Sequence, residues 1–587
     1  MKRPVLLILF FFLTVPLLAQ VPLAVPFEVD TFKSELRPLM ERYSADYGSV
    51  DRKFSTEYSP ARLRALKSLY AGWLARLDAL PYESLSKTGK IDATLFRNHL
   101  QREIRLVEKQ ESNIVEVSRL IPFAETVFLL ADSLREFRPV NPQQAATQLL
   151  QLTTKIEQTR KQIDSSDVPS AKTGKPKTRR TVARRAANIV QSLKATLKNW
   201  YEFYNAYDPL FTWWMEQPFQ SASKALDDYA TFITENLVGI KSDDKTTIIG
   251  DPIGREALLR ELAFEMIPYT PEELIALANK EFDWCETEMK KASSELGYGN
   301  DWKKALEYVK TLYVEPGKQP ELIRFLAREA EQFVVDNELV TVPPLARESW
   351  RMDMMTPKRQ LVNPFFTGGE VISVSFPTNT MTHEQKMMSM RGNNIHFSRA
   401  TVHHELIPGH YLQQFYQERF RSYRQFLGTP FWWEGNSLYF EMLFWDLNFP
   451  KSPENKIGML FWRMHRCARI IFSLSFHQEK MTPQECVDFL VDRVGHEREN
   501  AAGEVRRSFA GDYSPLYQCA YMLGGLQFRA LHKEMVESGK MTNRQFHDAI
   551  LKENAIPVEL IRADLLDQPP AKNFTSSWKF YGPSPGK

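Results

Sequence analysis

The segment from Ala400 to Gln413 constrains this chain most, because it sets three histidines and a glutamate beside a proline and a glycine. His404 and Glu405 are adjacent, and His410 follows six residues after His404. In the zinc-peptidase pattern H-E-x-x-H, two histidines one helical turn apart bind the metal and the glutamate between them acts as general base. Residues i and i+6 lie about 120° apart around a regular helix, so a regular helix could not direct both rings at one ion.

Pro408 and Gly409 lie between the two histidines and change what the backbone can do there. Proline lacks an N–H, and its ring crowds the carbonyl four residues earlier, which here belongs to His404. Glycine adopts backbone angles that other residues avoid. We therefore expect a widened or broken helical turn that brings the rings of His404 and His410 together. An ordinary loop with solvated histidines is the alternative interpretation.

The pattern His-Glu-x-x-Pro-Gly-His, followed by a Leu-Gln pair, resembles the bacterial domain-of-unknown-function 885 family. That family is grouped with the gluzincin type of zinc metallopeptidase, and dipeptidyl peptidase III has a similarly widened motif, H-E-x-x-G-H. The resemblance covers residues 25–575 and is sharpest from residue 250 onward. It implies a mainly α-helical, metallopeptidase-like fold with a cleft and a small β-sheet beside the active-site helix.

A catalytic zinc ion needs a third protein ligand and keeps one position open for water. Glu434 and Glu441 lie on roughly one helical face of the strongly aromatic segment 431–441, where an unpaired carboxylate would be costly to bury. The segment resembles the family's Glu-Gly-Trp-Ala-x-Tyr-x-Glu motif, with Asn436 and Ser437 in place of Trp-Ala. We assign Glu434 as the third ligand and Glu441 as the carboxylate that orients a ligating histidine. The choice between the two stays open, and surface or ion-paired glutamates are the alternative.

A peptidase also needs donors directed at the oxyanion of the tetrahedral intermediate. Residues 513–525 resemble the family's C-terminal Pro-Gly-Gln-Ala-x-x-Tyr-x-x-Gly motif, with Leu516 and Tyr517 in place of Pro-Gly. Tyr521 is the first candidate for this catalytic role, followed by Tyr517 and His496. Core packing is the alternative for Tyr521.

Two further assignments concern residues beside these motifs. Arg507 could pair bidentately with a substrate carboxylate, and we expect Tyr517 to contact substrate as well. An ordinary ion pair is the alternative for Arg507. His403 neighbours a ligand but points about 100° away around a helix, so we expect it to support the site or face solvent rather than bind metal.

Composition is that of an ordinary globular chain. The formal net charge of +3 gives no strong reason to expect a nucleic-acid partner or an anionic membrane surface. None of the four cysteines forms a C-x-x-C pair, which argues against a cysteine-based zinc site.

The N-terminus has the pattern of a secretory leader. A short basic start, Met1 to Arg3, precedes an apolar run from Val5 to Leu18 and a small residue, Ala19. The run is short for a membrane span, which needs about 20 apolar residues. We expect residues 1–19 to be a signal peptide, an uncleaved anchor being the alternative, and the protein to be periplasmic or secreted from a bacterium without stable membrane insertion.

Helical periodicity dominates the rest of the chain. Ser59-Pro60 predicts a helix start, and an apolar stripe follows at Leu63, Leu66, Tyr70, Trp73 and Leu77. Thr270 opens a capping box, from which a helix should run to Leu296. Residues 165–180 are predicted to be a solvated linker. We divide the chain into an N-terminal helical region, 20–240, and a catalytic region, 241–587.

Residues 371–377 alternate apolar and small polar side chains and predict a strand. The resemblance implies that Val371 to Phe376 forms an edge strand that holds the extended substrate backbone, although an ordinary structural strand is the alternative.

These observations predict a zinc-dependent peptidase, acting on short peptides, with one Zn²⁺ ion held by His404, His410 and Glu434. Glu405 would serve as general base towards a metal-bound water. The alternatives are a non-enzymatic helical binding protein of the cell envelope that keeps a vestigial metal site, and a metal-dependent amidase with a non-peptide substrate.

Overall fold

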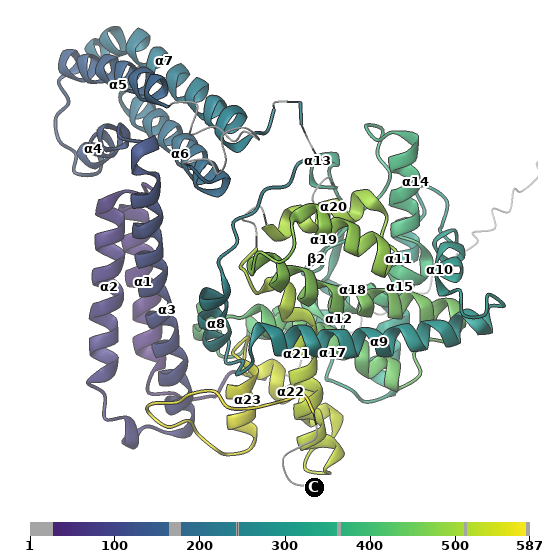
Figure 1. The fold of residues 1–587 in the computed structure, drawn as a ribbon. Coiled ribbons are helices and arrows are strands. Elements are labelled where there is room, and N and C mark those ends of the chain that lie inside the picture. The colour runs from purple at the N-terminus through teal and green to yellow at the C-terminus, as the bar shows by residue number, and fades with distance from the viewer. Residues whose placement is uncertain are drawn as a thin grey trace, which may run out of the picture.

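The computed structural model describes residues 28–163, 178–241, 243–244, 246–360, 365–509 and 513–582. These residues form a mainly α-helical molecule with one two-stranded sheet, which confirms the expected fold class (Figure 1). The predicted leader and nearly all of the predicted linker lie outside the described residues.

In the described residues, seven α-helices precede residue 240: α1 (Arg37–Lys53), α2 (Pro60–Asp78), α3 (Lys87–Val117), α4 (Ala124–Arg135), α5 (Pro142–Gln162), α6 (Arg180–Tyr204) and α7 (Pro209–Phe232). The other helices are α8 (Arg255–Phe264), α9 (Pro271–Glu295), α10 (Trp302–Lys310), α11 (Gln319–Asp336), α12 (Pro344–Ser349), α13 (Pro357–Gln360), α14 (His383–Gly392), α15 (Ile395–Glu405), α16 (His410–Gln417), α17 (Pro430–Asp446), α18 (Pro453–His477), α19 (Pro483–Phe489), α20 (Arg498–Phe509), α21 (Tyr517–His532), α22 (Asn543–Lys552) and α23 (Val558–Leu565).

The predicted helix starts are present. The Ser59 hydroxyl accepts a hydrogen bond from the backbone N–H of Arg62, and all five residues of the apolar stripe on α2 are buried. Thr270 and Glu273 form the reciprocal capping box at the start of α9. Each such cap satisfies backbone donors that the helix leaves free and contributes about 1 kcal/mol.

The described residues form two hydrophobic cores. The smaller one lies within residues 117–249 and joins α4 to α7, the group of helices at the upper left of Figure 1. The larger core includes α1 to α3 together with the helices from α8 onward. The smaller core therefore ends close to the expected boundary at residue 240, but the first three helices share the core of the C-terminal half.

A buried ion pair ties α3 to that C-terminal half. Asp92 of α3 accepts a hydrogen bond from the Arg424 guanidinium at 2.7 Å, and Glu553 pairs with the same guanidinium at 2.6 Å. All three side chains are almost completely buried. Removing one partner would leave an uncompensated buried charge, so this triad fixes how α3 docks.

Two of the central helices approach each other through glycines. A Cβ atom on Gly524 of α21 would lie 2.1 Å from the carbonyl oxygen of Phe431 of α17, and one on Gly435 would lie 2.5 Å from the Cα of Gly524. Only glycine permits this backbone contact. The contact holds the N-terminal halves of α17 and α21 together, and these carry Glu434 and Tyr517.

The small sheet is parallel and pairs β1 (Arg351–Met354) with β2 (Val371–Val374), Arg351 lying opposite Val371. The strand predicted at residues 371–377 is therefore present in shortened form. Thr367, just before β2, pairs with Ser373, and the backbone N–H of Gly369 lies 3.4 Å from the carbonyl of Glu405 at the end of α15. The sheet thus lies beside the helix that carries the histidine motif.

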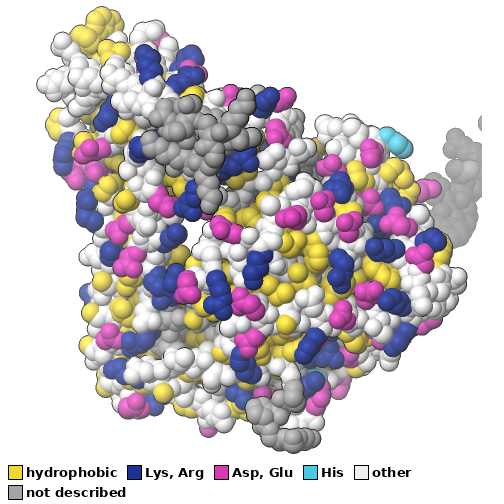
Figure 2. Space-filling model, viewed as in Figure 1, with side chains coloured by type: hydrophobic (Ala, Val, Ile, Leu, Met, Phe, Trp, Pro, Cys, Tyr) yellow, Lys and Arg dark blue, Asp and Glu magenta, His cyan; other side chains and the backbone are white. Residues whose placement is uncertain are grey.

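Acidic and basic side chains are interspersed over the face seen in Figure 2, which matches the small net charge. All four cysteines are buried and none is in a disulfide. No helix in the described part of the chain combines the length and apolar character needed to cross a bilayer.

Candidate metal centre

The helix that carries the motif breaks where Pro408 and Gly409 predict a break. α15 ends at Glu405 and α16 begins at His410, so the two histidines belong to different helices. The backbone N–H of Gly409 donates to the carbonyl of His403 at 3.0 Å. A Cβ atom on Gly409 would lie 1.8 Å from the carbonyl oxygen of His404, so this tight connection requires glycine.

The break brings three metal-binding groups to one point. The Oε2 atom of Glu434, from α17, lies 3.3 Å from His404 Nε2 and 3.1 Å from His410 Nε2. Zinc–ligand bonds of about 2.0–2.1 Å at tetrahedral angles separate neighbouring ligand atoms by about 3.3 Å. Both distances from Glu434 Oε2 therefore match the spacing of neighbouring ligand atoms around a single zinc ion.

Glu405 lies beside these ligands. One carboxylate oxygen of Glu405, one ring nitrogen of His404 and one ring nitrogen of His410 all lie within 4.8 Å of one another. Glu434 is closer to both rings, which makes Glu434 the better third ligand. Glu405 would then be free to accept a proton from a water molecule activated by such an ion.

The charges of this cluster explain how it is stable when buried. Burial works against the charged form of Glu434, yet His410 and His404 hold the pKa of Glu434 well below its usual value. Burial alone would lower the pKa of His410, but the Glu434 carboxylate outweighs it and raises that pKa to about 9. Protons on the imidazoles neutralise the carboxylate here, and a divalent cation would replace them.

A second carboxylate orients His404 from behind. Glu441, two turns along α17 from Glu434, lies 2.7 Å from His404 Nδ1 and 3.5 Å from the Arg466 guanidinium. A carboxylate that accepts the Nδ1 proton leaves the Nε2 lone pair free for a metal. Glu441 therefore lies at the opposite side of the His404 ring from Nε2, the atom that faces Glu434 and His410. This position favours Glu434 over Glu441 as the metal ligand.

A group that the sequence analysis did not single out orients the other ring. Gln413 Oε1 lies 3.2 Å from His410 Nδ1, and its amide nitrogen donates to Trp433 O and Ser437 Oγ, both at 3.0 Å. Ser437 in turn donates to the carbonyl of His404 at 3.1 Å. Ser437 is one of the two departures from the family motif, and it makes this network. The Leu-Gln pair after His410 was the signal for Gln413.

The two candidate tyrosines differ in position. The Tyr517 hydroxyl donates to Glu434 Oε1 at 2.5 Å, so it contacts a proposed ligand directly. The Tyr521 ring lies nearly parallel to the His404 ring at 6.0 Å and lines the same cavity. Burial raises the pKa of both phenols, so both remain protonated donors.

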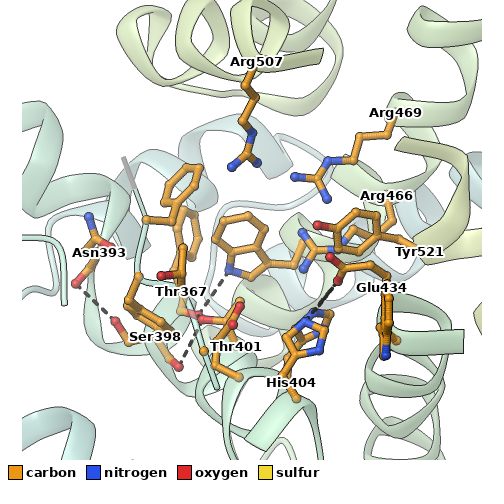
Figure 3. A pocket seen from close by; sticks show the side chains of 18 of the residues that line it. Thr367, Asn393, Ser398, Thr401, His404, Glu434, Arg466, Arg469, Arg507 and Tyr521 are labelled. Carbon is orange, nitrogen blue, oxygen red and sulfur yellow. Dashed lines mark hydrogen bonds and ion pairs between the residues drawn. The ribbon is translucent and has the colours of Figure 1, made fainter. Parts of the chain in front are cut away.

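The cavity in front of the two histidines and Glu434 has a volume of about 350 Å³. Glu405, His404, His410 and Glu434 line one part of it, and aromatic rings such as Trp433 and Trp462 line another. Figure 3 shows Arg466, Arg469 and Arg507 directed into the same space. Of these three arginines, only Arg507 was predicted from the sequence. Arg466 and Arg469 lie three residues apart in the largely apolar segment 457–477, but Arg463 in the same segment has the same pattern and does not line the cavity.

Three expectations need correction. His496 does not line the cavity: its Nε2 lies 2.9 Å from His465 Nδ1, and burial lowers the pKa of His496 to about 3. A neutral histidine held in this way is not placed to be catalytic. His403 does not face solvent, because its ring is buried and stacks on Phe444 at 4.6 Å, while its carbonyl accepts the Gly409 N–H at the break between the two helices. Burial lowers the pKa of His403 to about 4.

The third correction concerns the strand. No residue of Val371 to Phe376 lines the cavity, whereas the preceding segment from Phe365 to Gly368 does. The backbone next to the metal-binding atoms is therefore the approach to β2, not β2 itself.

The comparisons with known proteins agree with this fold. The family described as "Bacterial protein of unknown function (DUF885)" matches residues 38–565. The chain belongs to this family. A search of curated proteins gave no match for this DUF885 protein.

Two solved structures share the fold of this DUF885 protein. One, from Shewanella oneidensis, is described as a candidate lipoprotein of unknown function; it has a TM-score of 0.66 at 18% identity and covers 90% of this chain and 98% of that chain. The other, a candidate lipoprotein from Colwellia psychrerythraea, has a TM-score of 0.56 at 14% identity and covers 91% and 97%. At these identities the likeness concerns the fold.

Proposed function

We propose that this DUF885 protein is a metal-dependent peptidase whose single Zn²⁺ ion is held by His404, His410 and Glu434. The observation that carries the proposal is the sharing of one oxygen, Glu434 Oε2, by the Nε2 atoms of both histidines at 3.3 and 3.1 Å. Two imidazoles and one carboxylate, with a fourth direction open to a cavity, form the ligand set of hydrolytic zinc enzymes.

The bound metal would supply a Lewis acid and a water molecule with a lowered pKa. Glu405 would accept a proton from the water that attacks the scissile carbonyl, and would deliver it to the leaving amine as the C–N bond breaks. Tyr521, with Tyr517 as the second hydroxyl at the site, donates to the oxyanion of the intermediate. Glu441 keeps His404 in the tautomer that this arrangement needs.

The basic and apolar N-terminus supports a position outside the cytoplasm, in the periplasm or secreted. The two structural neighbours are described as candidate lipoproteins, which also favours the cell envelope. Substrates would then be peptides that reach that compartment, and short peptides fit the size of the cavity.

The Glu405→Gln variant tests this proposal. It removes the base and leaves the three ligands, so we expect one zinc ion per chain with peptide hydrolysis reduced by about 10²–10⁴-fold. Metal content is measured by atomic absorption, and hydrolysis on a mixture of short peptides is followed by mass spectrometry. Glu418→Gln, at an exposed glutamate just beyond α16, is the matched control. Full turnover by Glu405→Gln, or by the chelated wild type, would reject the mechanism.

A further inference from the structure

Three arginines face the proposed metal ligands across the cavity (Figure 3). Arg466 and Arg469 come from α18, a helix in which every residue from 457 to 477 is buried, and Arg507 comes from α20. Arg466 and Arg469 are 4% and 3% exposed. Charged groups buried this deeply in a protein need partners. We call Arg466, Arg469 and Arg507 together the arginine wall.

The carboxylates around the arginine wall are shared with other donors. Both oxygens of the buried Glu504 are taken, one by Arg469 Nε at 2.6 Å and the other by Arg507. The Gln518 amide also donates to the oxygen that Arg469 contacts. Arg466 has Glu441, at 3.5 Å, and that oxygen already accepts from His404. Each of these two carboxylates therefore serves more than one donor.

Two nitrogens of the arginine wall also lack hydrogen-bond partners. Among the described residues, Nη1 of Arg469 and Nε of Arg466 are buried without an acceptor. A buried donor with no acceptor costs about 1–3 kcal/mol, and more when the group is charged. These free donors, on two buried guanidinium groups that line the cavity, favour an anionic group bound there.

We propose, on the basis of the peptidase function above, that the arginine wall binds the C-terminal carboxylate of the substrate. The protein then removes a short C-terminal segment of one or two residues. Guanidinium groups hold a carboxylate in a planar, bidentate arrangement, which fixes the end of the chain as well as its charge. Every peptide has a C-terminal carboxylate, whereas an acidic side chain occurs in only some sequences.

The distance to the metal ligands sets the length of that segment. The Tyr521 ring lies between the two parts of the site, 6.0 Å from the His404 ring and 4.2 Å from the guanidinium carbon of Arg469. One extended residue spans about 3.3–3.6 Å, so one or two residues reach from a carbonyl at the metal to the arginine wall. A cavity of about 350 Å³ has little room for a longer segment.

The first test compares substrates on the zinc-loaded wild-type protein. Three blocked peptides share one sequence and differ at the end: a free C-terminal acid, a C-terminal amide, and an amide whose last residue is Asp. We expect kcat/KM for the acid to exceed that for the plain amide by about 10²-fold, because charge-assisted bonds are lost in the amide. Mass spectrometry should show release of the last one or two residues.

Equal hydrolysis of acid and amide, or cleavage far from the C-terminus, would overturn the inference. An Asp-containing amide cleaved as well as the acid would reassign the arginine wall to acidic side chains and overturn it too. Binding of the acid and amide to zinc-loaded Glu405→Gln separates this inference from the peptidase proposal, because it needs no turnover. If the acid binds about tenfold more tightly than the amide, the result supports carboxylate binding by the arginine wall even if no peptide is cleaved. Equal binding of acid and amide rejects it.

Variants of the wall give a second test. Arg469→Lys keeps the charge but loses the planar fork, and Arg507→Gln removes one charge while Glu504 keeps Arg469 and Gln518 as donors. Each should lower the acid-to-amide ratio about tenfold, mainly through KM. Arg463→Gln is the matched control, since Arg463 lies buried on the same helix and pairs with Glu281 at 2.8 Å outside this cavity.

A purely structural role for these arginines would lower acid and amide hydrolysis equally and leave the ratio unchanged. That result, in variants whose thermal unfolding matches the wild type, would contradict the inference.

Discussion

The imidazole of His404 has a carboxylate at each nitrogen, Glu441 at Nδ1 and Glu434 at Nε2. The two carboxylates have different roles because they contact different neighbours. Glu434 also contacts His410 and faces the cavity, whereas Glu441 contacts Arg466 and lies on the other side of the His404 ring. One is placed to bind the ion and the other to direct the ring.

The residue behind His404 should therefore tune metal affinity. Glu441→Gln weakens the hydrogen bond to Nδ1 and should lower zinc affinity by about 10–100-fold without abolishing binding. Competition with a chromophoric chelator measures this. Asp446→Asn, an exposed position near the end of the same helix, is the control. Wild-type affinity in Glu441→Gln would show that the contact does not orient a ligand.

Metal binding should release protons near neutral pH. The pKa of His410 is raised to about 9 by the Glu434 carboxylate, so the metal-free protein carries that proton at pH 7.5. Zinc must displace it, and zinc affinity should rise with pH until about pH 9 and then level off. Calorimetry in buffers of different ionisation enthalpy measures the release. No release at pH 7.5 would contradict the arrangement of these groups.

Features of the site that depend on residues close together in the sequence could be predicted. Spacing and the Pro408-Gly409 pair indicated the converging histidines, and Glu434 followed from a carboxylate in an aromatic segment. The position of His496 could not be predicted in this way, because its burial against His465 depends on how α18 packs. The same is true of Arg469, whose direction is set by the packing of distant helices.

The contact between α17 and α21 depends on two glycines, and it brings Tyr517 to Glu434. Gly524→Ala would place a methyl group against the Phe431 carbonyl, so we expect the free energy of unfolding to fall by about 1–3 kcal/mol and zinc affinity to fall with it. Urea unfolding measures the first and chelator competition the second.

Gly72→Ala is the matched control for that variant. Gly72 is an exposed residue in the middle of α2, and a Cβ atom there meets nothing within 4 Å. Alanine should raise the free energy of unfolding by about 0.5–1 kcal/mol, because glycine loses more backbone freedom on folding. Equal stability losses in the two variants would show that the helix contact is not the cause.

Elements with a strong local pattern were predictable, including the capped helices α2 and α9 and a strand near residue 371. The substrate-binding role expected for that strand could not be predicted from its pattern. Residues 371–376 do not line the cavity, whereas the segment before them does. A local pattern predicts that an extended segment forms, whereas its place relative to the helices depends on contacts distant in sequence.

Over the whole molecule, the proposed ligands all belong to one of the two cores. α15, α16 and α17 pack in the larger core, and α4 to α7 form the smaller one. A ligand that binds only the native state stabilises the part that holds it, by about 4 kcal/mol at a thousandfold excess over Kd. Calorimetric unfolding should therefore show that chelation lowers the melting temperature of the larger unit and leaves the α4–α7 unit unchanged. A uniform shift of the whole transition would contradict this separation.

We propose that two imidazoles from two helices and a carboxylate from a third share one cation. X-ray anomalous scattering at the zinc absorption edge, on crystals grown with zinc, is the decisive measurement. We expect one strong peak, about 2.0–2.2 Å from His404 Nε2, His410 Nε2 and Glu434 Oε2. A structure with no peak at these three atoms, or with zinc bound elsewhere while they point apart, would contradict it.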